Sequence, residues 1–343
     1  MAVYTILDRE LVSRLVADYE LGELVEIEPV ASGIENTNYF VWTKKTDQAR
    51  SAWVLTVFEN LVEEQLPFFN RLTHYLFSLG FSVPAPLAMK DGADYFQLSE
   101  AELTCGGKKC GVIVPRFSGK AKERHSIQEC QQIAQYMARM HLALQNFPAI
   151  RAVDHNFLWF ESRVHQLGEH LMKRDSELLE HAWQRYQSYI DKLNACTSGI
   201  VHGDLFRDNV LFDAHGISGV IDFYHAGFSP LLFDLAVAAN DWVVLANYDE
   251  VPNHSDAEQL SRKGLVYDES KLDAMFQAYI SVRPLTQMET ELWPRFLELA
   301  AFRFWLSRLK TLHLPGYQEN IKQGHCLKSP DAMRLILEAA MQR

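Results

Sequence analysis

The segment 199–222 restricts the fold of this chain more than any other part of the sequence. Short apolar runs flank a polar loop that carries His202, Asp204 and Asn209, and a second strand-like run ends at Asp222. This alternation predicts two strands that form a β-hairpin. Asp204 precedes Asn209 by five residues and Asp222 by eighteen. The loop therefore turns Asn209 back beside Asp204, and the hairpin brings Asp222 opposite.

Transfer of a phosphoryl group to a hydroxyl needs the residue types that this segment holds. A carboxylate accepts the hydroxyl proton, and oxygen ligands hold Mg²⁺ against the phosphates. Protein kinases place these groups at similar offsets. The pattern predicts Asp204 as the base, Asn209 and Asp222 as Mg²⁺ ligands, and His202 as a brace of the loop. A surface hairpin with polar turns is the alternative, and it does not explain these offsets between apolar runs.

The hydrophobic pattern of the 343 residues changes near residue 117, and the chain is too long for one hydrophobic core. Strand-like segments and one long helix from Pro67 come first, and helical periodicity follows from a capping box at Ser126 and Glu129. These patterns predict an α+β fold with two lobes. The N-terminal lobe, 1–116, is an antiparallel sheet crossed by the helix, and the C-terminal lobe, 117–343, is mostly helical. The expected strands are 25–30, 38–43, 53–58, 95–98 and 111–117, and the expected later helices include 232–246, 270–282, 295–311 and 331–341.

Charge and composition disfavour several classes of partner. Lys and Arg number 33 against 44 Asp and Glu, a net charge of −11, which argues against nucleic acid and anionic membranes as partners. No segment reads as a signal peptide or a membrane span, so a cytoplasmic location is expected. The five cysteines are too few for a disulfide framework. Cys105 to Cys110 reads as a hairpin turn and not as half of a zinc site, and nothing in the sequence predicts an oligomeric state.

The block His-Gly-Asp-Leu-Phe-Arg-Asp-Asn at 202–209, with the strand that ends in Asp222-Phe223, resembles the aminoglycoside-phosphotransferase and choline-kinase superfamily. Its members have a protein-kinase-like fold and phosphorylate small-molecule hydroxyls with ATP and Mg²⁺. The blocks GIENTNYFV at 33–41, VLTVFE at 54–59 and LPFF at 66–69 are similar to the bacterial homoserine kinases of this superfamily. The resemblance covers nearly the whole chain and implies ATP-dependent phosphorylation of L-homoserine to O-phospho-L-homoserine, a step of threonine biosynthesis.

The resemblance also implies how the nucleotide is held. The turn between the first two strands would be the nucleotide loop, where glycine lets the backbone approach the phosphates. The strand that leads into the second lobe would hydrogen-bond adenine through its backbone. The residues assigned to nucleotide binding in this way are Ser32, Gly33, Asn36, Thr37, Asn38, Thr56, Val114 and Arg116.

Thr56 departs from the wider superfamily, because a lysine that reaches the phosphates normally occupies its position on the third strand. The lysine–glutamate ion pair of protein kinases cannot form there, and Glu63 and Glu64 then read as a solvated surface. The block similar to homoserine kinases includes this threonine. A nucleotide-binding pseudokinase without turnover remains an alternative on the loss of lysine, although Asp204, Asn209 and Asp222 are all retained.

The acceptor pocket is less clearly marked in the sequence. The carboxylate of homoserine needs an arginine, and Arg207 inside the loop is the first candidate, with a surface or phosphate-contacting role as the alternative. Tyr224 and Trp242 follow Asp222 closely enough to line a pocket, although core packing explains them equally well. Arg303 and Arg308 are weaker candidates. Kinases of choline or an aminoglycoside are the same-fold alternative, and their cationic acceptors would need an acidic pocket.

Two further residues read as structural. Asp234 can cap the helix that follows it, and the resemblance suggests that it also braces the loop. His141 lies on the apolar face of the helix that begins after Ser126. A packed and hydrogen-bonded histidine is favoured there over a catalytic one.

Overall fold

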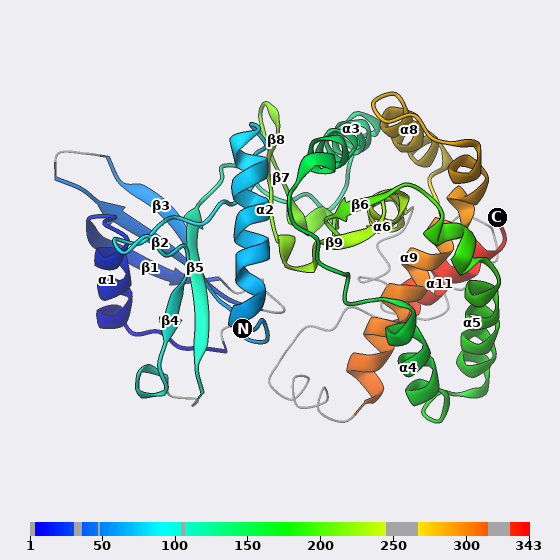
Figure 1. Ribbon diagram of the computed structural model, residues 1–343, viewed down its shortest axis with the longest axis horizontal. Helices are drawn as coiled ribbons and strands as arrows, with labels where there is room; N and C mark the ends of the chain where they lie inside the picture. Colours follow the sequence, from blue (N-terminus) through cyan, green and yellow to red (C-terminus); the bar gives the residue numbers. More distant parts are fainter. Residues whose placement is uncertain (1–3, 31–35, 47–48, 104–106, 245–266, 315–329) are drawn as a thin grey trace. The chain divides into compact units, whose positions relative to one another are not determined.

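A computed structural model of the chain describes residues 4–30, 36–46, 49–103, 107–244, 267–314 and 330–343 (Figure 1). The chain divides into two compact units, of which the first ends at Ser118 and the second begins at Gly119. Ser32, Gly33 and Cys105, which the sequence analysis singled out, lie outside the described residues.

The first unit is built on a five-stranded antiparallel sheet with the order β1-β2-β3-β5-β4. Its β2 alternates buried and half-buried side chains along its whole length, as one face of a sheet against a core requires. The five predicted strands are confirmed, with shifts of one or two residues at their ends. Their bounds are β1 Glu23–Pro29, β2 Thr37–Lys44, β3 Ser51–Val57, β4 Phe96–Leu98 and β5 Lys109–Pro115.

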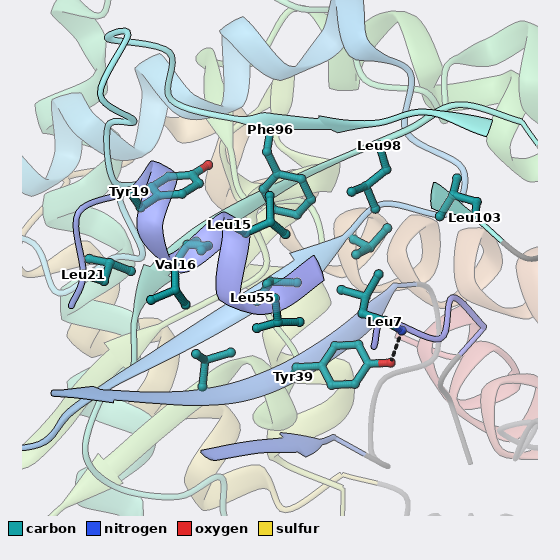
Figure 2. Close-up of a cluster of buried hydrophobic side chains, with 14 residues drawn as sticks. Leu7, Leu15, Val16, Tyr19, Leu21, Tyr39, Leu55, Phe96, Leu98 and Leu103 are labelled. Carbon is teal, nitrogen blue, oxygen red and sulfur yellow. Dashed lines mark hydrogen bonds between the residues drawn. The ribbon is translucent and has the colours of Figure 1, made fainter. Parts of the chain in front are cut away.

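Helix α1, Arg9–Asp18, covers the buried face of this sheet. Asp8 caps it, and its carboxylate accepts a hydrogen bond from Leu11 N at 2.8 Å. Figure 2 shows the core that forms between α1 and the sheet, where Tyr39 accepts a hydrogen bond from Leu7 N at 3.1 Å. Its buried members include Val12, Leu15, Val16, Tyr19, Val41, Leu55, Val57, Phe96, Leu98 and Ile113.

A second helix, α2, Leu66–Ser78, lies between β3 and β4 in the sequence. Pro67 is in its first turn, where the missing N–H group has no helical partner to lose. Leu66, Phe69, Leu72 and Leu76 form its buried face. Two short 3-10 helices, η1 Glu63–Gln65 and η2 Glu100–Glu102, complete the first unit.

Most of the second unit is helical. The central helix, α9, packs against α4, α5, α6 and α11, and α3 packs against α8. The predicted capping box opens α3, where Ser126 and Glu129 exchange hydrogen bonds. The helices are α3 Ile127–Ala143, α4 Phe157–Gly168, α5 Lys173–Asn194, α6 Leu232–Trp242, α8 Glu269–Ile280, α9 Gln287–His313 and α11 Pro330–Met341, with η3 Leu144–Asn146 after α3.

Two small antiparallel sheets lie among these helices, where the sequence analysis expected one hairpin. β7, Val210–Asp213, pairs with β8, Gly216–Val220. β6, Ser198–Val201, pairs instead with β9, Gly227–Pro230, a strand that was not predicted. Gly227 and Pro230 gave β9 the composition of a turn, and its pairing with β6 overrides that local preference.

Helix α9 begins at Gln287, eight residues before its predicted start. Pro294 reads as a helix boundary but lies inside the helix, because a capping box of Thr286 and Glu289 starts it earlier. Within the described part of the chain, no helix is both long and apolar enough to cross a lipid bilayer.

Candidate active site

The loop 202–209 follows β6 and is held in a conformation that only glycine adopts easily at its second residue. Gly203 has φ +80°, and a Cβ atom there would lie 2.9 Å from the carbonyl oxygen of His225. The left-handed region and this close approach both exclude larger side chains. The loop backbone therefore packs directly on the segment after Asp222.

Asp204 and Asn209 are brought together as their spacing predicts. A 3-10 turn, η4 (Arg207–Asn209), reverses the loop. Asn209 Nδ2 then donates to the Asp204 carbonyl at 2.7 Å and to Asp204 Oδ2 at 3.2 Å. Since the amide nitrogen bonds Asp204, the amide oxygen is directed away from it and can serve as a hard ligand of a cation.

His202 links the loop to the segment that carries Asp222. Its Nδ1 accepts a hydrogen bond from Asp204 N at 3.3 Å, and its Nε2 donates to Ile221 O at 2.9 Å. The ring is fully buried, and burial lowers its pKa, so the imidazole is neutral near pH 7. His202 thus fixes the loop and the end of β8 as one piece.

Asp222 has an unusual backbone. Its φ of 66° and ψ of 61° place it in the left-handed region at the start of η5, Phe223–His225. Such a conformation costs a non-glycine residue roughly 1–2 kcal/mol, and strain of this kind concentrates at functional sites. Ile221 N donates to Asn209 O at 2.9 Å, which keeps Asp222 next to Asn209 in the fold.

Asp234, at the start of α6, is fully buried beneath the loop. Its carboxylate accepts hydrogen bonds from His202 N at 2.7 Å, Gly203 N at 2.6 Å and His141 Nε2 at 3.0 Å. Burial by itself would raise the pKa of Asp234, but the bonds from His141 and the loop hold it below its usual value. His141 contacts the hydroxyl of Tyr279 at 2.8 Å, so a chain of buried polar groups links the loop to α3 and α8.

Arg207 and Trp242 contact the loop and its surroundings. Arg207 forms an ion pair with Asp241 at 3.2 Å, its backbone N donates to the same carboxylate at 2.7 Å, and its Nη1 donates to Glu123 O at 2.7 Å. The indole of Trp242 is 3% exposed and donates to Leu205 O at 3.2 Å. These contacts favour a role in holding the loop over one in binding an acceptor.

Tyr224 lies in η5 and is half-buried. Burial, followed by the nearby Asp222 carboxylate, raises the pKa of Tyr224 well above its ordinary value. The phenol therefore stays protonated at any physiological pH.

In the first unit, three of the nucleotide-binding candidates, Asn38 on β2, Thr56 on β3 and Val114 on β5, share the face of the sheet opposite α1. Asn38 pairs with Thr56, and the Thr56 hydroxyl donates to Asn38 Oδ1 at 2.7 Å. On the neighbouring pair of strands, β3 and β5, Val54 pairs with Val114. This face therefore carries two polar side chains, Asn38 and Thr56, next to the apolar side chains of Val54 and Val114.

Arg116 follows β5 and stacks on aromatic rings of β2. Its guanidinium carbon lies 3.8 Å from the centroid of Phe40 and 5.3 Å from that of Trp42. Cation–π contacts of this kind hold the arginine at the edge of the same face. Asn36, just before β2, accepts a hydrogen bond from Glu59 N at 3.4 Å.

Thr37 faces the opposite side of the sheet and belongs to a buried polar network that the sequence analysis missed. Its hydroxyl donates to Glu59 Oε1 at 2.6 Å and accepts from Thr5 N at 3.0 Å. Lys109 forms an ion pair with Glu59 and donates to Thr5 Oγ1 at 2.6 Å. Glu59 directly follows an apolar strand in the sequence, and this position could have indicated the network. A carboxylate that is buried there needs a partner, because buried charges are normally paired.

Arg303, which ranked below Arg207 in the sequence, is the cation beside Asp204. It lies on α9, is 3% exposed, and its Nη1 is 3.8 Å from Asp204 Oδ1. The signal for it in the sequence is an arginine inside the apolar run 299–306, since full burial of a guanidinium is rare without a specific partner.

Comparison with known proteins agrees with this arrangement. The sequence model described as "Phosphotransferase enzyme family" matches residues 26–261. The chain is 34% identical over 342 residues to a homoserine kinase of Janthinobacterium sp. (strain Marseille), which covers 99% of this chain and 97% of that protein.

Solved structures show the same fold. An amicoumacin kinase, solved with AMP-PNP and Ca²⁺, superposes with a TM-score of 0.66 at 16% identity, covering 98% of this chain and 94% of that one. A choline kinase from Cryptosporidium parvum Iowa II gives 0.59 at 14% identity, covering 98% and 96%. The predicted protein-kinase-like fold is confirmed. Because the family model spans more than half of the chain and the relative matches nearly all of it, the chain belongs to the phosphotransferase enzyme family.

Proposed function

We propose that this chain is a homoserine kinase, which uses ATP and Mg²⁺ to phosphorylate the hydroxyl of L-homoserine in threonine biosynthesis. The observation that carries the proposal is the hydrogen-bonded pair of Asp204 and Asn209, fastened by His202 to the segment of Asp222. Relatives named homoserine kinase, such as the one from Janthinobacterium sp., support the choice of acceptor.

Asp204 is the group that takes the proton of the acceptor hydroxyl. Its Oδ2 is hydrogen-bonded by Asn209 at 3.2 Å, and Arg303 lies 3.8 Å from its Oδ1. These two contacts orient the carboxylate. A carboxylate positioned in this way contributes typically about 10²- to 10⁴-fold to a proton-transfer step.

The amide oxygen of Asn209 and the carboxylate of Asp222 would hold Mg²⁺. When bound, the ion neutralises charge on the phosphates. Hard oxygen donors fit this ion, which usually takes one or two protein ligands and completes its shell with water and phosphate oxygens. Among the described residues, no group of three or more His, Cys, Asp or Glu could hold a metal alone.

The face of the first unit's sheet opposite α1 would bind ATP. Asn38 and Thr56 offer polar groups for the phosphates, while the apolar strip around Val54 and the backbone near Val114 suit adenine. Asn36, Thr37 and Arg116 would help to bind the nucleotide, and Ser32 and Gly33 remain candidates from the sequence. No lysine is needed at Thr56 if backbone amides and the cation carry most of the phosphate charge.

A coupled assay of ADP release across acceptors tests the proposal. The panel contains L-homoserine, 3-aminopropan-1-ol, choline and an aminoglycoside, each with ATP and Mg²⁺. L-Homoserine should give the highest kcat/KM, and chelation of the divalent cation should abolish turnover. Preferential use of choline or the aminoglycoside would refute homoserine as the acceptor, and ATP binding without turnover of any acceptor would favour the pseudokinase.

A further inference from the structure

Arg303 combines burial with proximity to the proposed base. The side chain is 4% exposed and that of Asp204 is 20% exposed. Its Nη1 lies 3.8 Å from Asp204 Oδ1, which is longer than the roughly 2.7–2.9 Å of a charge-assisted hydrogen bond. The two groups therefore attract each other at longer range. This places a guanidinium directly beside the carboxylate that would hold the acceptor hydroxyl.

A neighbouring histidine accepts a hydrogen bond from Arg303. Its Nη2 donates to His155 Nδ1 at 3.2 Å, which requires that nitrogen to be an unprotonated acceptor. Burial first, and then the charges of Arg303 and His225, hold the pKa of His155 far below its ordinary value. Lys310 and Arg151 also act on His155. A neutral histidine therefore holds the guanidinium of Arg303 and adds no charge beside it.

Aromatic packing fixes the guanidinium relative to the loop. The guanidinium carbon lies 3.7 Å from the ring centroid of Phe304. Phe304 in turn packs edge-to-face on Phe206, two residues after Asp204, with 4.5 Å between ring centroids. Stacking and burial remove most of the rotamer freedom of the side chain, so little entropy is lost when it binds a planar anion.

Arg207 is differently placed. Asp241 supplies it with both an ion pair and a hydrogen bond to its backbone, and Glu123 O accepts from its Nη1. Its charge is thus matched by a carboxylate that is itself nearly buried, at 9% exposed. An acceptor carboxylate would have to compete with Asp241 for Arg207.

We propose that Arg303 binds the α-carboxylate of the amino-acid acceptor whose hydroxyl is held by Asp204. In homoserine four single bonds join the hydroxyl oxygen to the carboxylate carbon, a span of about 5 Å at bond lengths near 1.5 Å. That span fits a hydroxyl on Asp204 and a carboxylate on the guanidinium 3.8 Å away. The inference rests on the proposed function for the identity of the acceptor, and it makes Arg303 the residue that selects amino acids over amino alcohols.

The test compares two acceptors that differ only in the carboxylate, L-homoserine and 3-aminopropan-1-ol, in the parent enzyme and in Arg303→Gln. Removing one partner of a buried charge pair is strongly unfavourable, so kcat/KM for L-homoserine should fall by about 100-fold or more, mainly through KM. The KM for ATP should change by less than about threefold, and kcat/KM for 3-aminopropan-1-ol should fall far less than kcat/KM for L-homoserine. We therefore compare the ratio of kcat/KM for L-homoserine to kcat/KM for 3-aminopropan-1-ol. Any loss of activity that acts through Asp204 is common to both acceptors and cancels in this ratio.

Two further variants control for structure. Arg295→Gln is the same change on the same helix, at a residue whose ion pair with Glu298 is backed by Arg185, and it should keep the parental ratio. Arg303→Lys retains the charge without the planar fork. It should fold as the parent does, by circular dichroism and thermal melting, and lower the ratio by about tenfold. If Arg303→Gln does not fold, the lysine variant alone decides the question.

The outcomes separate this inference from the proposed function. A parent enzyme that uses L-homoserine, with a ratio unchanged in both Arg303 variants, overturns the inference and leaves the function standing. An equal loss for both acceptors, or a rise confined to the KM for ATP, also overturns it, because Arg303 would then serve Asp204 or the phosphates. A parent enzyme that prefers another hydroxy amino acid, with a ratio that collapses in Arg303→Gln, supports the inference and refutes homoserine.

Discussion

Replacing Asp234 by asparagine should uncouple the loop from the helices behind it. The carboxylate is fully buried and accepts three hydrogen bonds, two from loop amides and one from His141. Asparagine keeps one oxygen and places an NH₂ group where the second oxygen was. One loop amide and the amide group of asparagine would then be donors facing each other.

The cost can be worked from these contacts. The hydrogen bond of one loop amide is lost, and the remaining bonds lose the charge of the carboxylate. A hydrogen bond to a charged group is worth about 1.5–3 kcal/mol, and a buried donor left without an acceptor costs about 1–3 kcal/mol, so the free energy of unfolding should fall by about 3–5 kcal/mol. Asp234→Ala leaves both loop amides without an acceptor and should cost at least as much. The difference in the free energy of unfolding between the parent and Asp234→Asn should become smaller below about pH 4. The pKa of the carboxylate in the folded protein lies below the unfolded value of 3.8, so the stabilisation that the carboxylate provides disappears as pH falls through that folded pKa.

Urea unfolding at pH 7 and at acid pH measures this effect, with kcat as a second readout. Asp191→Asn, an exposed aspartate on α5, is the matched control and should unfold as the parent does. A urea midpoint for Asp234→Asn within about 0.5 kcal/mol of the parent, at unchanged m, would refute the reasoning that Asp234 fastens the loop.

Three further results are expected. Asp204→Asn should lower kcat by about 10²-fold or more in the ADP-release assay while thermal melting stays near that of the parent; turnover within a few-fold of the parent would remove Asp204 from the role of base. Thr56→Lys should not raise kcat/KM, because its hydroxyl bonds Asn38 and the longer side chain would crowd that pair; a large gain would favour a degraded kinase. His125 is stacked on Trp242 with 3.9 Å between ring centroids, and burial chiefly lowers its pKa to about 4. Between pH 6.5 and 4 the unfolded chain protonates this histidine while the folded protein keeps it neutral, so the free energy of unfolding falls as pH falls. His125→Phe should flatten the pH dependence of unfolding in that window by about 3 kcal/mol; parallel curves for parent and variant would contradict this.

The local sequence determined most of the secondary structure and the contact between Asp204 and Asn209 within the loop. Asp204 and Asn209 are five residues apart, so a single tight turn suffices to join them, and a spacing in the sequence predicts the contact. Alternation of apolar and polar residues likewise predicted the strands of the first unit. Where the pattern was ambiguous, at β9 and at Pro294, local preference was overridden by strand pairing and by a capping box upstream.

Tertiary structure alone decided which distant charges meet. His141, Asp234 and Tyr279 are separated by 93 and 45 residues, yet they form one hydrogen-bonded chain under the loop. Arg207 is adjacent to the base in sequence but is engaged by Asp241, whereas Arg303 reaches Asp204 from a helix 99 residues further along. Hydrophobic periodicity specifies which face of an element is buried, but it does not specify which other element covers that face. Pairings between buried charges depend on that choice, so they appear only once the helices have packed.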